Sequence, residues 1–206
     1  MKKISMIVLT VLTFGMTSCD MDKMPYDAIP AEEALTTIVG FEEARAGIYS
    51  VYLGLTGGSY VLAPEVQADA FNAVADFSNK YGELHRWTFE STNSTVETIW
   101  ANCYAAIGRA NFFIDGVGKI DENPEIELTE IQKQQINVYE GEAYFTRAYC
   151  YFYLATLFCR DYDVATAANT PGLPLQVKYE PQLAATQYPG RSSLEDTYKQ
   201  ILEDLE

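Results

Sequence analysis

The chain is poor in basic residues and in histidine. Of its 206 residues, 14 are Lys or Arg and 29 are Asp or Glu, which gives a formal charge of −15 at pH 7. Binding to nucleic acid needs clustered cationic side chains, and a field of this sign repels phosphate, so we expect no nucleic-acid partner. The single histidine, His85, excludes sites built from several histidines and the HExxH motif of zinc proteases.

The usual signatures of catalytic, cofactor and metal sites are also missing. The sequence contains no GxSxG elbow, no GxxxxGK[ST] phosphate loop, no dinucleotide GxGxxG and no CxxC pair. An acidic loop lacks the central glycine of an EF-hand, because Ile126 stands at that place, and a solvated loop is the favoured interpretation. We therefore expect a protein that is not an enzyme and that holds neither a metal nor a cofactor. The acidic loop consists of Asp121, Asn123, Glu125 and Glu127.

Long uncharged runs are absent except at the N-terminus. Lys2 and Lys3 precede 13 uncharged residues, 4–16, a run too short to cross a bilayer and typical of a secretory signal. Small residues then precede Cys19, as in a bacterial lipobox, where the cysteine is acylated, for example with palmitate. We expect residues 1–18 to be a lipoprotein signal peptide and residues 19–30 to be an unstructured tether anchored through Cys19. The alternative is an ordinary signal peptide with an incidental cysteine.

Three further cysteines favour a fold without disulfides. The odd number of Cys103, Cys150 and Cys159 cannot pair completely. Cys150 and Cys159 are expected to share one helix, too far apart for a disulfide, and to be buried apolar thiols.

Helical spacing of apolar residues dominates the rest of the chain, with almost no strand-like alternation. Helices are predicted over about 31–55, 94–116 and 130–159, with a short helix and a long loop between 60 and 92. A capping box at Thr129 and Gln132 starts the third helix, and Ser192 and Ser193 cap a last one. The predicted fold class is all-α with long irregular loops. A tetratricopeptide-like solenoid and four helices in antiparallel pairs both fit this pattern. The last helix is expected to bury a stripe of Leu194, Tyr198, Ile201, Leu202 and Leu205.

The helix around residues 139–154 carries bulky aromatic residues on more than one face. Enclosure on most sides is the favoured interpretation, and an aromatic ligand platform is the alternative. Glu142 and Arg147 are then expected to be half-buried charges satisfied by partners on neighbouring helices.

These motifs together resemble the SusD/RagB family of outer-membrane nutrient-binding lipoproteins. The resemblance implies a tetratricopeptide-like α-α superhelix on the outer face of the outer membrane. It also implies capture of oligosaccharides or peptides and their delivery to a TonB-dependent barrel of the SusC type. Family members are usually more than twice as long, so residues 31–206 correspond to the N-terminal portion of a SusD-like helical domain, truncated relative to the family. The resembling stretches are Cys19-Asp20, 41–49 (FEEARAGIY), 68–70 (ADA), 100–111 (WANCYAAIGRAN), 141–154 (GEAYFTRAYCYFYL), 172–175 (GLPL) and 188–193 (YPGRSS).

The stretch 69–89 is the predicted ligand site, because it combines flat aromatic rings with planar hydrogen-bonding groups between helices. We expect Trp87 and Tyr81 to stack on sugar rings, and Asn79, Arg86 and Asp69 to bind hydroxyl groups. The alternative places Trp87 in the core.

Two other classes of function stay open from the sequence. One is a helical protein-interaction module of the outer membrane with no small-molecule ligand. The other is a glycan-cleaving lipoprotein.

Overall fold

The computed structural model of the chain describes residues 30–74, 80–124, 126–180 and 188–206. The signal peptide, Cys19 and Asn79 lie outside these ranges. Within them the secondary structure is helical, apart from one isolated bridge between Pro171 and Ser193, so the all-α prediction is confirmed. None of the described helices combines the length and the apolar character that a membrane span requires. The helices are α2 (Ala31–Ala34), α3 (Ile38–Leu55), α4 (Ser59–Gln67), α5 (Gly82–His85), α6 (Ser94–Gly118), α7 (Glu130–Phe158), the short 3₁₀ helix η1 (Ala167–Asn169) and α8 (Leu194–Leu205).

The long helices begin at side chains that accept hydrogen bonds from their first turns. The predicted capping box is present on α7, where Thr129 Oγ1 accepts from the Gln132 backbone and Gln132 Oε1 accepts from the Thr129 backbone. Ser193 caps α8, as predicted, and Asn93 caps α6, which was not predicted. Each cap satisfies N–H groups that have no partner inside the helix.

The predicted helix over 31–55 is wrong as a single element. The chain leaves α2 after Ala34, and α3 begins at Ile38. Thr37 takes extended backbone angles between them, and its Oγ1 accepts a hydrogen bond from Gly40 N at 3.2 Å. An N-cap within the apolar pattern therefore starts a new helix.

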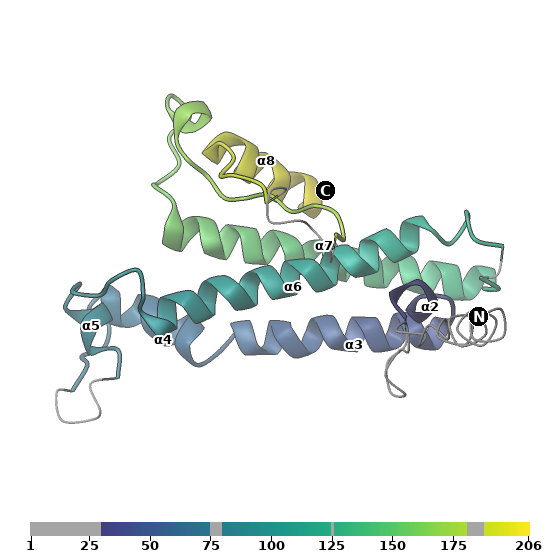
Figure 1. The fold of residues 1–206 in the computed structure, drawn as a ribbon, viewed down its shortest axis with the longest axis horizontal. Helices are drawn as coiled ribbons and strands as arrows, with labels where there is room; N and C mark the ends of the chain where they lie inside the picture. The colour runs from purple at the N-terminus through teal and green to yellow at the C-terminus, as the bar shows by residue number, and fades with distance from the viewer. Residues whose placement is uncertain (1–29, 75–79, 125, 181–187) are drawn as a thin grey trace, which may run out of the picture. The chain divides into compact units, whose positions relative to one another are not determined.

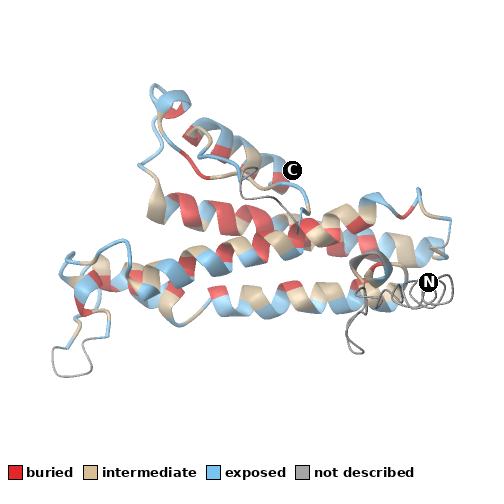
Figure 2. Cartoon of the chain, viewed as in Figure 1, coloured by how far each residue is buried: buried red, intermediate tan, exposed pale blue. Residues whose placement is uncertain are grey.

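Residues 34–206 form one unit, in which three long helices lie side by side. Helices α6 and α7 form an antiparallel hairpin, and α3 packs against both (Figure 1). Helix α8 packs on α7, together with the irregular segment that precedes it. The buried residues concentrate on the facing sides of α6 and α7 (Figure 2).

The core between these helices is closed by aromatic and small side chains. Phe41 of α3 meets Phe113 of α6 edge to face, with ring centroids 5.5 Å apart, and both rings are buried. Tyr139 and Tyr151 of α7 are buried as well, so enclosure of this helix is confirmed for them, whereas Phe145 points outward and is 47% exposed. Cys150 is a buried free thiol, as predicted, whereas Cys159 is only half-buried. Cys103 is a buried free thiol as well.

Helix α8 buries a different stripe from the predicted one. Leu194 and Ile201 are buried as expected, but Leu202 and Leu205 are 60% and 55% exposed. Asp204 is buried in their place, because both of its carboxylate oxygens accept hydrogen bonds from the buried Arg147 of α7. Asp204 therefore faces α7, whereas Leu202 and Leu205 lie on exposed sides of α8.

Both charges of α7 that were predicted to be satisfied by neighbours have their partners. Arg45 of α3 binds Glu142 through two hydrogen bonds of 2.5 and 2.8 Å. Arg147 binds Asp204 through bonds of 2.8 and 2.6 Å, and its third bond reaches Asn111 Oδ1 of α6 at 2.8 Å. Burial by itself lowers the pKa of Arg147, but the hydrogen bonds and charge of Asp204 outweigh that effect, so its pKa stands above the ordinary value.

We expect ionisation of the Tyr151 hydroxyl to lower the free energy of unfolding at alkaline pH. Burial raises its pKa to about 12, and the hydrogen bond with Gln176 only partly offsets this. An unfolded tyrosine ionises near pH 10. The folded state therefore holds the proton over a window in which the unfolded state has lost it. This contribution of Tyr151 to the free energy of unfolding, roughly 2–3 kcal/mol, is fully present below pH 10. It is lost as the pH rises to about 12.

Urea unfolding between pH 8 and pH 12 measures this loss. Tyr151→Phe is expected to lower the free energy of unfolding at pH 8, because its hydroxyl bonds are gone, yet to give a shallower decline above pH 10. An alkaline decline as steep as that of the wild type would contradict the assignment.

Candidate functional site on the α4–α5 segment

Three residues of the predicted ligand stretch adopt left-handed backbone conformations. Asp69, Tyr81 and Trp87 have φ values of 58°, 61° and 54°, and among the described residues they are the non-glycine residues with positive φ. This conformation costs a side-chain-bearing residue about 1 kcal/mol or more, and such strain tends to cluster at functional sites. The segment therefore holds these side chains in positions that an unstrained chain would not give them.

Trp87 lies on the surface and not in the core. Its side chain is 65% exposed, and its Nε1 donates a hydrogen bond to the backbone oxygen of Gln67 at 3.2 Å. The ring also contacts Phe89, with centroids 6.2 Å apart. One edge of the indole is thus fixed to the end of α4 while much of the ring remains open to solvent. A rigid, exposed aromatic face is the group that stacks on the C–H face of a sugar ring.

His85 connects the two ends of this segment. Its Nδ1 lies 3.1 Å from the backbone oxygen of Val66, and since a carbonyl can only accept, Nδ1 carries the proton. The exposed carboxylate of Asp69 lies 3.8 Å from the same nitrogen. Together with the Trp87 bond to Gln67, these contacts bring Asp69, His85 and Trp87 to one edge, where the end of α4 meets the end of α5.

Of the other described residues predicted for the site, Tyr81 lies away from this edge and Arg86 lies beside it. Tyr81 precedes α5, and its hydroxyl lies 2.9 Å from Ser59 Oγ at the start of α4, so its half-buried ring anchors the segment at the end away from Trp87. Arg86 is the exposed C-cap of α5, next to Trp87. The predicted set therefore separates into a surface cluster of Asp69, Arg86 and Trp87, joined by His85, and an anchor, Tyr81.

The side chains of this cluster are suited to binding polar, uncharged ligands. The exposed carboxylate of Asp69 can accept hydrogen bonds from hydroxyl groups, and the exposed guanidinium of Arg86 can donate to them, beside the aromatic face of Trp87. Among the described residues, no group of three or more His, Cys, Asp or Glu side chains is placed to hold a metal ion.

Two further hollows were not predicted from the sequence. A groove of about 290 Å³ between α3 and α7 is lined mainly by apolar side chains, including Tyr49, Tyr52 and Phe145. A larger pocket of about 360 Å³ lies over Gly108 of α6, beneath the irregular segment before α8. Tyr179 and Tyr188, on either side of residues 181–187, were the available signal for the second hollow, but they lie 71 and 80 residues from Gly108 in the sequence.

Comparison with known proteins gives the family. Residues 29–206 match the model of a SusD-like family described as "Starch-binding associating with outer membrane". The chain belongs to the SusD-like family.

A SusD-like relative and a solved structure agree with this membership. The SusD-like protein P2 of Formosa agariphila is 26% identical over 200 residues, which cover 90% of this chain and 37% of that protein. A SusD superfamily protein from Bacteroides thetaiotaomicron has the same fold, with a TM-score of 0.59 and 19% identity, over 82% of this SusD-like chain and 36% of that one. The chain thus spans little more than a third of the length of either relative.

Proposed function

We propose that this chain is the helical portion of a cell-surface lipoprotein that captures glycans and delivers them to an outer-membrane barrel of the SusC type. Membership of a family described as starch-binding and associated with the outer membrane supports the glycan and the location. The observation that carries the proposal is the indole of Trp87, which is held on a strained turn and open to solvent beside Asp69 and Arg86.

The proposed mechanism is reversible binding of the glycan, with no covalent step. Trp87 stacks on the apolar face of a sugar ring, Asp69 accepts hydrogen bonds from its hydroxyl groups, and Arg86 donates to ring or hydroxyl oxygens. His85 keeps the turn closed through its bond to Val66. Asn79 joins the hydrogen-bonding set in this proposal, although it lies outside the described residues. A peptide is the second ligand class, since its amide groups suit the same donors and acceptors.

The anchor and the partner are further parts of the proposal. Cleavage of residues 1–18 leaves Cys19 at the new N-terminus, where its acyl chains hold the protein in the outer membrane, facing the exterior. Purification from membranes in mild detergent, followed by intact-mass spectrometry, tests both parts. An acylated Cys19 and a co-purifying SusC-type barrel are the expected results. A chain that keeps residues 1–18, or that is recovered without a barrel, would contradict the respective part.

Trp87→Ala is expected to weaken glycan binding about 30-fold, because a central aromatic contact contributes about 2 kcal/mol. Isothermal titration with maltoheptaose and with neutral xylo- and galacto-oligosaccharides measures the change. Phe152→Ala is the matched control, since it removes an exposed ring that belongs to α7 and not to the α4–α5 segment. It should leave the affinity unchanged.

The same titration separates the competing classes of function. Saturable binding that Trp87→Ala leaves intact would remove Trp87 from the site. Protein partners without any glycan or peptide affinity would favour an interaction module. Release of shorter products from a polysaccharide would favour a glycan-cleaving protein and overturn the binding-only proposal.

A further inference from the structure

The pocket over Gly108 has a floor without a side chain and walls of aromatic and polar groups. It encloses about 360 Å³, within the range of small-molecule sites. Gly108 lies in the middle of α6, and a Cβ added there would meet nothing within 4 Å. A glycine at this place costs the helix stability relative to most other residues, and here it keeps the floor of the pocket open.

The segment above the floor is fixed by the protein core. The Tyr151 hydroxyl donates to Gln176 O at 2.8 Å and accepts from Gln176 N at 2.7 Å. Asn111 Nδ2 donates to Gln176 O at 2.8 Å and to Lys178 O at 3.2 Å, while Arg147 holds the other side of the Asn111 amide. The backbone of Gln176 is therefore bonded to two helices, although it belongs to no helix or strand itself.

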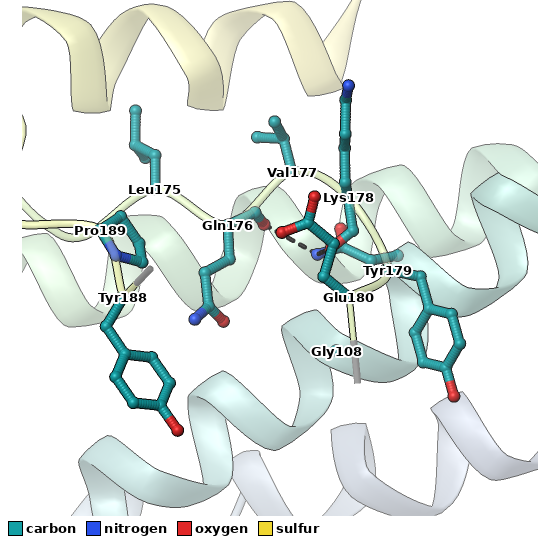
Figure 3. Close-up of a pocket in the computed structure, with 10 residues that line it drawn as sticks. Gly108, Leu175, Gln176, Val177, Lys178, Tyr179, Glu180, Tyr188 and Pro189 are labelled. Atoms are coloured by element: carbon teal, nitrogen blue, oxygen red, sulfur yellow. Dashed lines mark hydrogen bonds between the residues drawn. The ribbon is translucent and has the colours of Figure 1, made fainter. Parts of the chain in front are cut away.

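Fixing this backbone sets the direction of the side chains. In Figure 3 the side chains of Gln176, Tyr179 and Tyr188 extend from the loop to the same side, with the Gln176 amide between the two phenol rings. Leu175 and Val177 extend to the opposite side. The ring of Tyr179 is held edge to face against Phe112 of α6, with centroids 4.9 Å apart. Two aromatic walls and a carboxamide thus face one hollow before any ligand arrives.

The chemistry of the walls selects the class of ligand. Phenol rings offer flat apolar faces, and their hydroxyl groups and the Gln176 amide both donate and accept hydrogen bonds. The charges of Lys178 and Glu180 on the rim cancel, and the chain as a whole carries −15, which disfavours an anion. A purely apolar ligand would leave the amide without a partner. A neutral sugar ring satisfies both kinds of group.

We propose that the Gly108 pocket is a second saccharide site, in which Tyr179 and Tyr188 flank one neutral sugar ring and Gln176 binds its hydroxyl groups. This inference rests on the proposed glycan-binding function but not on the Trp87 cluster, which belongs to α4 and α5 and shares no residue with the pocket.

The test records binding at the two places separately. The full chain, purified in mild detergent, carries 3-fluorotyrosine at position 188 and the substitution Trp100→Phe. The ¹⁹F resonance then reports the pocket, and the fluorescence of the remaining tryptophan reports Trp87. The probes are maltoheptaose and neutral xylo- and galacto-oligosaccharides, with an oligogalacturonide as the anionic counterpart. The ¹⁹F resonance is expected to shift saturably with at least one neutral probe, and Trp87→Ala should leave that shift unchanged.

Filling the pocket supplies the decisive variant. Gly108→Leu is expected to weaken binding at the fluorinated tyrosine at least tenfold without unfolding the chain, because leucine favours the helix and the space is open. Gly47→Leu is the matched control, since it makes the same change at an open helical position of α3 outside the pocket. Tyr188→Ala, measured by calorimetry on a Trp87→Ala background, is expected to lower the affinity for the neutral oligosaccharide about tenfold. The substitution should leave the core intact, because Tyr188 is 63% exposed.

Each outcome bears on one of the two proposals. A response at Trp87 with no shift at position 188 would overturn this inference and leave the proposed function standing. A shift at position 188 with no response at Trp87 would support the pocket and overturn the assignment of Trp87. A shift that Gly108→Leu leaves intact, or a preference for the oligogalacturonide, would overturn the neutral-saccharide pocket. Failure of every probe at both reporters would overturn both proposals.

Discussion

Replacing Arg147 by methionine is expected to lower the free energy of unfolding by about 3–5 kcal/mol, the range for breaking a buried ion pair on one side. The side chains of Arg147 and Asp204 are 5% and 2% exposed. Without the guanidinium, the Asp204 carboxylate keeps its burial but loses two charged hydrogen bonds, and Asn111 Oδ1 loses its donor as well. Urea unfolding at pH 7 measures the change.

A double variant distinguishes loss of the pair from loss of packing. Arg147→Met combined with Asp204→Leu removes both charges, and it should recover most of the lost stability, because two apolar side chains can replace a buried pair at little cost. Lys199→Met is the control at an exposed pair, where Lys199 Nζ and Glu203 Oε1 are 3.8 Å apart, and its effect should stay below about 0.5 kcal/mol. A double variant no more stable than Arg147→Met would contradict this account.

The second large effect is expected from Gly172→Ala, at about 2–3 kcal/mol of destabilisation. Gly172 is buried where the loop crosses the first turn of α8, and its N–H donates to Ser192 O at 2.7 Å. An added Cβ would lie 2.7 Å from the carbonyl carbon of Ser193, and closer still to the oxygen of that carbonyl and to Thr197 Oγ1. Backbone atoms cannot turn aside as the end of a flexible side chain can, so the loop or the helix must shift.

Gly190→Ala is the matched control for this substitution. Gly190 lies in the same connection before α8, and a Cβ there would meet nothing within 4 Å. Its replacement should change the free energy of unfolding by less than about 0.5 kcal/mol. Equal losses for the two alanine variants, measured by urea unfolding, would show that the loop as a whole, and not the close approach at Gly172, sets the cost.

The sequence predicted the helix boundaries best where a side chain near in sequence decides them. The capping box at Thr129 and the serine cap at Ser193 depend on residues three positions apart, and both were predicted correctly. Thr37 was overlooked, although it uses the same chemistry, because no glycine or proline between Ala31 and Val39 marks a break in the helix. Local caps can thus be found from sequence when composition changes beside them, and are missed when it does not.

Side-chain exposure and pockets depend on contacts that the sequence does not display. The exposure of Trp87 follows from its left-handed backbone and from its bond to Gln67, 20 residues away. The exposed leucines of α8 follow from Asp204, which was not expected to be buried. The Gly108 pocket requires a helix and a loop separated by about 70 residues, and no periodicity within either one predicts their meeting.

The ion pair between α7 and α8 also sets an order of events during biosynthesis. Asp204 follows Arg147 by 57 positions, so at 5–20 residues per second it emerges roughly 3–11 s later. Until then the α6–α7 hairpin carries a cation at the centre of its future core, together with a loop whose anchor, Asn111, is not yet oriented. Over this interval the buried cation of α7 lacks its partner, and the contact between α7 and α8 can form only after Asp204 has been added.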